Sequence, residues 1–252
     1  MDRLHVEEQI SFSCEQLGDT AIIIQFGSEI TPEIHEKVKA FTNALEENPF
    51  YGFIECVPAF TSVTVYYDPF LVFQNRKLSD GATNIESVSQ LISSYLKGVT
   101  KKLLLEEVNQ SRKIEIPVCY GGEYGPDLEA VASYHDLTVN EVIKIHSEKE
   151  YVVYMIGFAP GFPYLGGMSE KIATPRKSTP RLTIPEGAVG IAGKQTGIYP
   201  ISTPGGWQII GRTPYSLFNT SKYPPSLLQS GDVIKFVPIT ITEYEKYKET
   251  SV

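Results

Sequence analysis

Strand-like runs separated by short polar turns characterise the first seventy residues. Four runs carry the β-branched and aromatic residues that favour strands, and Gly18-Asp19 between the first two suits a tight hairpin turn. Asp68-Pro69 predicts the end of the fourth run and the start of a polar loop. The predicted strands are Ser11–Leu17, Thr20–Phe26, Gly52–Pro58 and Thr61–Tyr67.

Two amphipathic helices are predicted among and after these strands. Apolar residues recur every three to four positions after Thr31, which is predicted to cap a helix with Pro32 at its first position. The same period runs from Ile85 to Leu96 and predicts a second helix that ends at Gly98. The order ββαββα therefore predicts a small α+β sandwich, with its helices on one face of the sheet.

The next segment combines two further helices with two strands. A helix is predicted from Pro126 to Tyr134, and Thr138 forms a capping box with Glu141 at the start of another helix. His135 and His146 stand at the ends of these helices, where the helix dipole favours a cationic side chain. This position predicts a structural role for both histidines rather than metal binding. The flanking strands are Ile114–Tyr120 and Tyr151–Gly157.

Short strands and turns fill the rest of the chain, which predicts a closed or half-closed β-barrel. Thr242–Glu249 predicts a short terminal helix. The pattern changes within Lys101–Lys113, and we expect a domain boundary there. An α+β domain would then occupy residues 1–105 and a mainly β domain residues 106–252. The predicted barrel strands are Arg181–Ile184, Val189–Ala192, Thr196–Tyr199, Trp207–Arg212 and Asp232–Val237.

The composition of the 252 residues narrows the functional classes. The formal net charge of −8 argues against non-specific nucleic-acid binding. No apolar run approaches the about 18 residues that cross a bilayer, and the acidic start MDRLHVEEQI lacks the apolar core of a secretory signal. Cys14, Cys56 and Cys119 are odd in number and widely spaced, which is typical of thiols in a reducing compartment. We therefore expect a cytoplasmic protein.

The stretch from Met155 to Pro214 has an unusual composition. It contains 11 of the 20 glycines, 8 of the 17 prolines and the only tryptophan, Trp207. Glycine permits positive φ and close backbone approach, while proline fixes φ, so the stretch predicts tight loops between strands. Its six basic residues outnumber two acidic ones, which predicts a site for a carboxylate or phosphate among these loops. The basic residues are Lys171, Arg176, Lys177, Arg181, Lys194 and Arg212.

Several catalytic motifs are excluded by the sequence. The stretch contains no His, Cys or Asp, so it cannot form a zinc site or a Ser–His or Cys–His pair by itself. Gly193-Lys194 resembles part of a P-loop, but Ala188 and Gln195 stand where that motif requires Gly and Ser or Thr. The chain has no G-x-S-x-G or H-E-x-x-H motif. The aromatic residues in and near the loops either belong to the core or line a groove; they are Phe158, Phe162, Tyr164 and Trp207.

Four long runs in the second half of the chain are specific enough to compare with known families. They are GFAPGFPYLGG, PRKSTPR, GIAGKQTGIYPISTPGGWQIIGRT and SGDVIKF. Together with EQLGDTAIIIQFG near the start, they resemble the allophanate hydrolase subunit 1 family over nearly the whole chain. That family includes the B subunit of the bacterial ATP-dependent 5-oxoprolinase and KipI-type inhibitors of a sporulation sensor histidine kinase. The resemblance implies an α+β N-terminal domain and a cyclophilin-like β-barrel.

The resemblance also implies partners and a reaction. The partners would be a subunit-2 protein, which is of the KipA type and corresponds to the C subunit of 5-oxoprolinase, and the A subunit of the same enzyme. The reaction would open 5-oxo-L-proline to L-glutamate with ATP hydrolysis. ATP would bind elsewhere in the complex or at a subunit junction, and the isolated chain would be inactive.

The implied chemistry assigns roles to residues of the glycine-rich stretch. Arg181 and Lys194 are the predicted catalytic charges, which would bind a carboxylate or stabilise an oxyanion or phosphate. No metal is expected. The predicted substrate-binding residues are Gln195, Thr196, Tyr199, Ser202, Gly205, Gly206 and Trp207.

The main alternative to an enzyme subunit is a protein-binding module that inhibits a sensor histidine kinase. Buried aromatic side chains commonly anchor such interfaces. A third possibility is a scaffold that only completes the fold of its partner. The predicted partner-binding residues are Phe158, Pro160, Phe162 and Tyr164.

Overall fold

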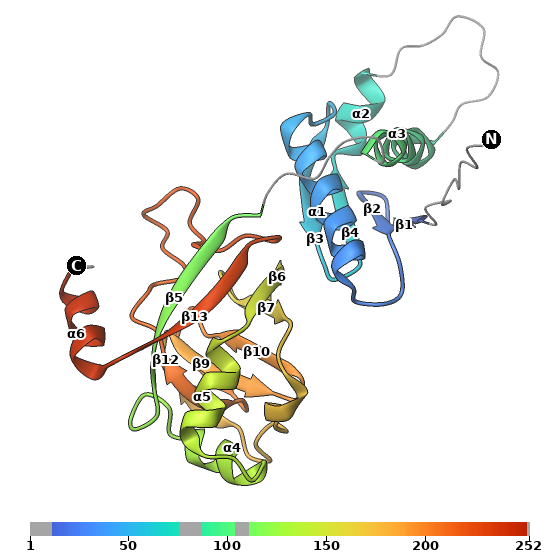
Figure 1. Cartoon of the computed structure of the whole chain (residues 1–252). Helices are drawn as coiled ribbons and strands as arrows, with labels where there is room; N and C mark the ends of the chain where they lie inside the picture. The colour runs from blue at the N-terminus through green and yellow to red at the C-terminus, as the bar shows by residue number, and fades with distance from the viewer. Residues whose placement is uncertain (1–11, 76–86, 104–110, 251–252) are drawn as a thin grey trace, which may run out of the picture. The chain divides into compact units, whose positions relative to one another are not determined.

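The computed structural model describes residues 12–75, 87–103 and 111–250 of the chain. The chain divides into two compact units, residues 1–109 and 110–252 (Figure 1). Each has its own apolar core. Ser11, Ile85 and the expected boundary after residue 105 lie outside the described residues. Among the described helices, none is both long and apolar enough to cross a membrane.

The N-terminal unit is built on a four-stranded antiparallel sheet in the order β1-β2-β4-β3. Alternate side chains of the central strands, such as Ile22, Ile24, Val63 and Val65, are fully buried in the core. All four strands lie within two residues of their predicted bounds. They are β1 (Ser13–Leu17), β2 (Ala21–Gln25), β3 (Phe53–Pro58) and β4 (Ser62–Tyr67), and the helices are α1 (Pro32–Glu47), α2 (Pro69–Asn75) and α3 (Val88–Leu103).

Helix α1 begins where the sequence predicts it. The side chain of Thr31 accepts a hydrogen bond from the backbone N–H of Ile34 at 3.3 Å, which satisfies one of the free donors of the first turn. The apolar stripe of the helix is fully buried against the sheet and α3, which confirms the predicted amphipathic helix. That stripe consists of Val38, Phe41 and Leu45.

Helix α2 corrects the prediction of a polar loop after Asp68-Pro69. The carboxylate of Asp68 accepts hydrogen bonds from the backbone N–H groups of Phe70 at 2.8 Å and Leu71 at 3.1 Å. These bonds cap a new helix, and Pro69 suits its first position because that residue needs no N–H partner. The pair that ends the strand therefore also starts a helix.

Helix α3 corrects the predicted helix end at Gly98. The helix continues to Leu103, because Leu96 and Thr100 are buried on either side of the glycine and keep this segment packed on the core. Gly98 itself faces open space. The penalty of about 1 kcal/mol for a glycine inside a helix is therefore outweighed by burial.

The C-terminal unit contains a closed barrel of seven strands in the order β10-β7-β6-β13-β5-β12-β9, which confirms the predicted barrel. Its pairs are antiparallel except β5 and β13, which are parallel. The first and last strands of the unit are thus neighbours. The barrel strands are β5 (Lys113–Tyr120), β6 (Glu150–Ile156), β7 (Pro163–Gly166), β9 (Ala188–Ala192), β10 (Gln195–Ile198), β12 (Gln208–Arg212) and β13 (Val233–Ile239), and a separate pair joins β8 (Arg181–Ile184) to β11 (Thr203–Gly205).

Strands β7 and β11 are missing from the sequence-based prediction. Each contains a proline and a glycine, which are depleted in strands: Pro163 and Gly166 in β7, and Pro204 and Gly205 in β11. Pairing with β6 and β10 holds β7 in place, and pairing with β8 holds β11. Tertiary pairing therefore overrides local propensity in the very segments that carry the aromatic and glycine-rich loops.

Four helical segments accompany the barrel, and α4 and α5 lie side by side against it in Figure 1. The predicted capping box is confirmed, because Thr138 accepts a hydrogen bond from the Glu141 backbone N–H and the Glu141 carboxylate accepts one from the Thr138 backbone N–H. The segments are α4 (Leu128–Tyr134), α5 (Val139–Ser147), the 3₁₀ turn η1 (Glu170–Ile172) and α6 (Ile241–Thr250).

His146 has a structural role as predicted, but burial rather than the helix dipole explains it, since the dipole would favour a cationic ring. Its ring is fully buried and stacks on Phe236 with 4.4 Å between centroids. Nδ1 lies 2.7 Å from the Tyr120 hydroxyl, and Nε2 lies 2.8 Å from the Thr196 hydroxyl. Burial lowers the pKa of His146 to about 3, so the imidazole is neutral at physiological pH. His135 at the end of α4 instead pairs with the Thr174 hydroxyl at 3.1 Å.

Candidate functional site

A cavity of about 320 Å³ lies in the C-terminal unit where β7, the loop before β8 and the segment around β11 come together. Its walls are mainly aromatic and glycine or proline residues, and all the aromatic ones except Phe158 belong to or pack against an apolar cluster separate from the barrel core. We call it the aromatic cavity. The lining residues are Phe158, Phe162, Tyr164, Arg176, Pro180, Tyr199, Pro204, Gly205, Gly206 and Trp207.

Phe162 is the centre of the aromatic walls. It is 2% exposed, and its ring makes edge-to-face contacts with those of Tyr164, Tyr199 and Trp207 at centroid distances of 5.2, 5.6 and 5.7 Å. Such contacts stabilise one arrangement of the rings. The rings of the walls therefore support one another.

Two glycines allow the rings to come close to the backbone. A Cβ atom on Gly205 would lie 2.5 Å from the Tyr199 hydroxyl, and one on Gly197 would lie 3.1 Å from both Phe162 and Trp207. A side chain at either position would displace an aromatic wall. The glycines that made this stretch stand out in the sequence thus shape the cavity.

Phe158 forms the outer rim of the cavity. It is 68% exposed although its ring also contacts Phe162 at 5.4 Å between centroids. Its φ of 65° lies in the left-handed region, which an aromatic residue rarely adopts. An exposed aromatic side chain in an unfavourable backbone conformation is a feature of functional rims, and here it points to recognition of an apolar group.

Tyr199 is the buried polar group of the walls. Burial raises the pKa of Tyr199 to about 12, although the nearby charge of Arg176 and a hydrogen bond from the Trp207 backbone act to lower it. The phenol is therefore protonated at neutral pH and can donate a hydrogen bond. Arg176 itself forms no ion pair or hydrogen bond with the residues that the structure describes.

A buried carboxylate ties the cavity loop to the barrel. Asp127, at the start of α4, is 4% exposed and accepts two hydrogen bonds from the Arg181 guanidinium, at 2.7 and 2.8 Å. It also accepts hydrogen bonds from Lys177 Nζ at 2.9 Å and from the Ile209 backbone N–H at 2.7 Å. Burial alone would raise the pKa of Asp127, but these donors together lower it. The carboxylate therefore stays ionised and holds three segments together.

Further backbone contacts fix the same loop. The Lys177 backbone N–H donates to the Gly206 carbonyl at 2.7 Å, and the Gln208 side chain donates to the Pro175 carbonyl at 2.9 Å. Arg176 lies between Pro175 and Lys177 in the chain, so the backbone is hydrogen-bonded on both sides of it. Arg176 is exposed and lines the cavity.

The structure brings together residues from two of the predicted groups. Four predicted substrate-binding residues and three predicted partner-binding residues line the same cavity. The two predicted groups therefore share one cavity. The members are Tyr199, Gly205, Gly206 and Trp207 from the first group and Phe158, Phe162 and Tyr164 from the second.

Other predicted residues lie elsewhere. Arg181 forms an ion pair with Asp127 and does not line the aromatic cavity. Lys194, at the turn between β9 and β10, forms an exposed ion pair with Glu170. Thr196 is fully buried inside the barrel, where its hydroxyl contacts His146, and it does not line the aromatic cavity. Three further predicted residues do not line the aromatic cavity: Gln195, Ser202 and Pro160.

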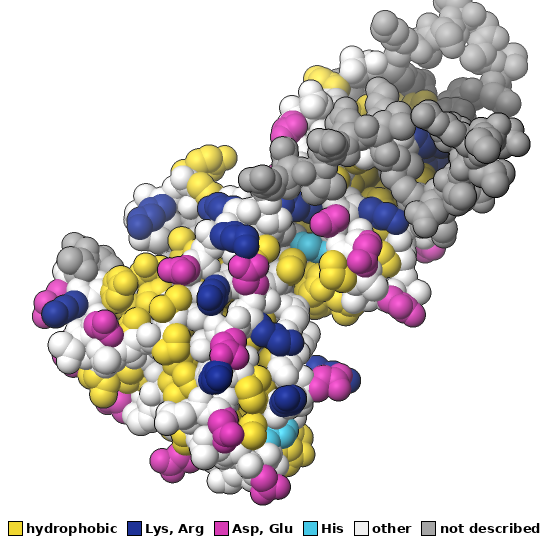
Figure 2. Space-filling view, in the orientation of Figure 1, with side chains coloured by type: hydrophobic (Ala, Val, Ile, Leu, Met, Phe, Trp, Pro, Cys, Tyr) yellow, Lys and Arg dark blue, Asp and Glu magenta, His cyan; other side chains and the backbone are white. Residues whose placement is uncertain are grey.

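Charge pairing explains why the basic stretch does not form a basic surface. In Figure 2, acidic and basic side chains are interspersed over the visible face of the C-terminal unit. Lys177, Arg181 and Lys194 are paired with carboxylates, and Arg212 Nε donates to the Glu186 carbonyl at 2.7 Å. Of the six basic residues of the stretch, Arg176 and Lys171 are left without a side-chain partner among the described residues.

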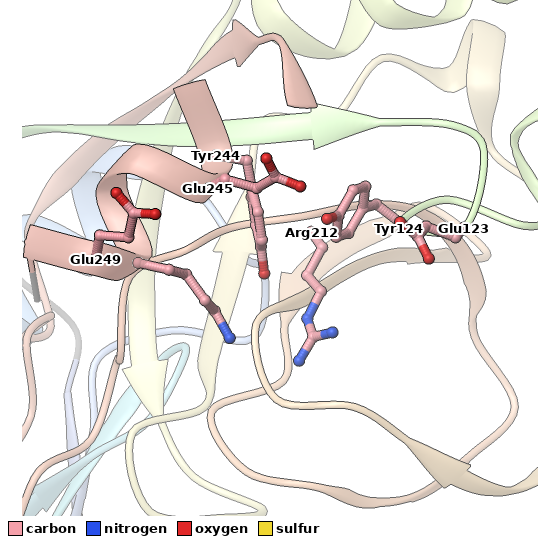
Figure 3. Close-up of a pocket in the computed structure, with 7 residues that line it drawn as sticks. Glu123, Tyr124, Arg212, Tyr244, Glu245 and Glu249 are labelled. Carbon is pink, nitrogen blue, oxygen red and sulfur yellow. The ribbon is translucent and has the colours of Figure 1, made fainter. Parts of the chain in front are cut away.

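A second cavity, of about 470 Å³, lies between α6, β12 and the connection from β5 to α4 (Figure 3). Its acidic residues outnumber its basic ones, so it does not favour an anion. The rings of Tyr124 and Tyr244 pack against each other there, 4.5 Å apart. None of the predicted site residues lines it. The lining residues are Glu123, Tyr124, Arg212, Tyr244, Glu245, Lys248 and Glu249.

The described residues contain no group of three or more His, Cys, Asp or Glu side chains placed to hold a metal ion. The aromatic cavity itself is lined by no carboxylate, imidazole or thiol in the part of the chain that the structure describes. It can therefore bind a ligand and donate hydrogen bonds, but its own walls supply no strong general base at neutral pH.

Comparisons with known proteins show similarity over most of the chain. The family described as carboxyltransferase domain, subdomain C and D, matches residues 12–228. The chain is 54% identical over 243 residues to the B subunit of 5-oxoprolinase from Bacillus subtilis (strain 168), which covers 96% of this chain and 99% of that protein. A solved structure of a conserved uncharacterized protein from Pyrococcus horikoshii is 46% identical with a TM-score of 0.52, covering 92% of this chain and 100% of the other.

A further solved protein, TTHA0988, is longer than this chain. It is 34% identical with a TM-score of 0.70, and the match covers 87% of this chain but only 40% of that protein. A unit with this fold thus also occurs joined to other segments in a single polypeptide.

Proposed function

The chain belongs to the carboxyltransferase family, subdomain C and D, and we propose that it is one component of a complex that opens 5-oxo-L-proline to L-glutamate with ATP hydrolysis. The observation that carries this proposal is the end-to-end similarity to a protein named as the B subunit of 5-oxoprolinase, at 54% identity and 99% coverage of that protein. In this reaction water adds to the lactam carbonyl carbon, the C–N bond breaks, and the nitrogen leaves as an amine. ATP supplies the activation of this stable amide.

The lining of the aromatic cavity supports a role in binding rather than complete catalysis. It offers apolar walls, the Arg176 cation and the protonated Tyr199 hydroxyl, but no side chain that would deprotonate water. Partner proteins, the A and C subunits of the enzyme, therefore supply the missing groups and the ATP site. The occurrence of this unit inside the longer TTHA0988 protein is consistent with such a need for further segments.

Reconstitution tests the proposal. The chain is purified alone and together with the A and C subunits from the same host, and release of L-glutamate and ADP is measured with and without 5-oxo-L-proline. We expect equal amounts of both products from the complete complex and neither from the chain alone. A complete complex that releases no ADP in response to 5-oxo-L-proline would refute the function, and turnover by the isolated chain would refute the need for partners.

A second candidate function, inhibition of a sensor histidine kinase, is favoured by one observation. Phe158 is 68% exposed at the cavity rim, and exposed aromatic residues commonly anchor protein interfaces. Phe158→Ala should then weaken inhibition of kinase autophosphorylation while leaving the buried walls intact. If no excess of this protein slows any sensor kinase of its host, this candidate is excluded.

We also propose the cytoplasm as the location of the protein. Its three cysteines are free thiols, and a reducing compartment keeps thiols in that state. Detection of the protein outside the cytoplasmic fraction of its host would contradict this.

A further inference from the structure

Of the residues described as lining the aromatic cavity, only Arg176 carries a charge. The other basic side chains of its loop, Lys177 and Arg181, are both bound by Asp127. Arg176 has no such partner among the described residues, so its five N–H donors are available to a ligand. A guanidinium presents these donors in a planar fork that matches the two oxygens of a carboxylate.

The backbone on either side of Arg176, whose side chain is exposed, is held by hydrogen bonds. Pro175 and Lys177, its two neighbours in the chain, are hydrogen-bonded through their backbone to Gln208 and Gly206. Asp127 adds the ion pair to Lys177. A preorganised backbone reduces the conformational entropy that binding would otherwise cost. The backbone of the loop therefore needs no reordering when Arg176 binds a ligand, and the conformational cost is that of its side chain.

The electrostatic environment favours an anion. Asp127 is the carboxylate bonded to this loop, and it faces both Lys177 and Arg181. Together with Arg176, these four side chains carry an excess of two positive charges. Tyr199 adds a neutral hydroxyl, whose oxygen accepts a hydrogen bond from the Trp207 backbone.

The size and walls of the cavity select a small ring. A volume of about 320 Å³ is near the lower end of ligand pockets, which span about 300–1,000 Å³. Rings of Phe162 and Trp207 provide apolar surfaces in edge-to-face contact, and Gly205, which also lines the cavity, adds no side chain beside the Tyr199 hydroxyl. A five-membered lactam with one carboxylate combines an apolar ring, an amide and a single negative charge. These are the groups that the cavity complements.

We propose that the aromatic cavity is the site on this chain for 5-oxoproline, with the ring against the aromatic walls and the carboxylate on Arg176. The inference rests on the proposed function for the identity of the ligand, and it adds the site and the residue that selects it. Tyr199 donates its hydroxyl proton to the lactam carbonyl oxygen. Arg181, by contrast, acts as a positioning residue that holds the loop through Asp127.

Binding to the full-length chain tests the site directly. Trp207 is the only tryptophan of the chain and lines the cavity, so its fluorescence reports occupancy. The chain is titrated with 5-oxo-L-proline and with 2-pyrrolidinone, which has the same ring but no carboxylate. We expect saturable binding of 5-oxo-L-proline, weakened about tenfold or more in Arg176→Ala, because one charge-assisted pair is lost. Binding of 2-pyrrolidinone should be weak and equal in both proteins.

Two further variants make the test specific. Lys171→Ala removes another basic side chain that has no partner among the described residues and does not line the cavity, so it should bind 5-oxo-L-proline like the wild type. Arg176→Lys keeps the charge but loses the planar fork and should bind with intermediate strength. The proposal is overturned if the wild-type chain shows no saturable binding, if Lys171→Ala weakens binding as much as Arg176→Ala, or if Arg176→Ala weakens both ligands equally.

Kinetics of the complete complex separate this inference from the proposed function. In the complex, Arg176→Ala should raise the KM for 5-oxo-L-proline about tenfold or more and leave the KM for ATP unchanged. If the wild-type complex turns over 5-oxo-L-proline but Arg176→Ala has a normal KM, the site is wrong and the function stands. If the chain binds 5-oxo-L-proline through Arg176 but the wild-type complex does not open it, the site stands and the function is wrong.

Discussion

Replacing Asp127 with asparagine should destabilise the C-terminal unit and release the loop that borders the aromatic cavity. The buried carboxylate accepts hydrogen bonds from Arg181, Lys177 and the Ile209 backbone N–H. Asparagine has nearly the same size and can still accept a hydrogen bond from Ile209. The substitution therefore removes the negative charge while disturbing the packing as little as any side chain can.

The magnitude follows from the exposure of the two cations. Removing one partner of a fully buried ion pair costs about 3–5 kcal/mol, because the other charge is left without compensation. Here the side chains of Arg181 and Lys177 are 28% and 32% exposed, so water can solvate them in part. We therefore expect a loss of about 2–3 kcal/mol in the free energy of unfolding.

The same substitution should change the acid sensitivity of the unit. The hydrogen-bonding donors lower the pKa of Asp127 in the folded protein below its unfolded value, despite the opposing effect of burial. The unfolded chain therefore binds a proton at higher pH than the folded one. The stabilisation is complete above about pH 4 and is lost as the pH falls through the folded pKa. Asp127→Asn lacks this contribution and should show a shallower loss of stability below about pH 4.

Urea unfolding followed by Trp207 fluorescence measures both effects, because the single tryptophan lies in the C-terminal unit. Glu129→Gln is the matched control, since Glu129 also belongs to α4 but is exposed. The control should unfold at the wild-type urea concentration. The structural reasoning is refuted if Asp127→Asn loses less than about 0.5 kcal/mol, the range of ordinary surface substitutions, or if the control loses as much.

Mild acid should weaken the C-terminal unit through His146, whose pKa is about 3 when folded and 6.5 in the reference state. The contribution of the neutral imidazole to the free energy of unfolding is complete above about pH 6.5 and falls by up to about 1.4 kcal/mol per pH unit below it. If His146→Gln shows the same dependence of urea stability on pH as the wild type, this prediction is wrong. Gly205→Ala should lower the urea midpoint, because its Cβ would lie 2.5 Å from the Tyr199 hydroxyl. Gly206→Ala should not, because the atom nearest to its Cβ would be 3.6 Å away. Equal midpoints for the two variants would show that Tyr199 can shift without loss of stability. Lys194→Ala should leave the urea midpoint unchanged, because the ion pair of Lys194 is exposed. Turnover of the complete complex then tests the predicted catalytic role of Lys194: loss of turnover in the variant supports that role, and wild-type turnover contradicts it. Residues 110–252 expressed alone should unfold cooperatively, because their core is self-contained, and a non-cooperative transition would argue against the expected two domains.

Elements with local signals could be predicted from the sequence. Thr31 and Thr138 each cap a backbone group three residues away, so the cap, the helix start and the apolar stripe lie in one short segment. The errors arose where a local signal has two meanings. Asp68-Pro69 ends a strand and also begins α2, and Gly98 resembles a helix terminus but lies inside α3. Burial of neighbouring residues decides such cases, and a single sequence does not show burial.

The aromatic cavity could be predicted only in part. The glycine and proline content pointed to the correct stretch, and seven of the predicted residues do line the cavity. Asp127 carried no signal, because its partners Lys177, Arg181 and Ile209 lie 50, 54 and 82 residues away. Arg176 and Arg181 belong to the same PRKSTPR run, and composition does not distinguish the free guanidinium from the paired one. Only the fold, which brings Asp127 to one of them, separates their roles.

The parallel pairing of β5 with β13 also determines when the barrel can close during synthesis on the ribosome. Lys113 pairs with Val233 in the two strands. Next to them, the Arg112 side chain donates a hydrogen bond to Asp232, which lies 120 residues later in the sequence. At about 5–20 residues per second, β5 emerges roughly 6–24 s before its partner. Until then β5 and β6 each expose an edge, because β13 lies between them. A nascent chain released before β13 would carry two unpaired strand edges, which are templates for aggregation, in a unit whose other strands are all present.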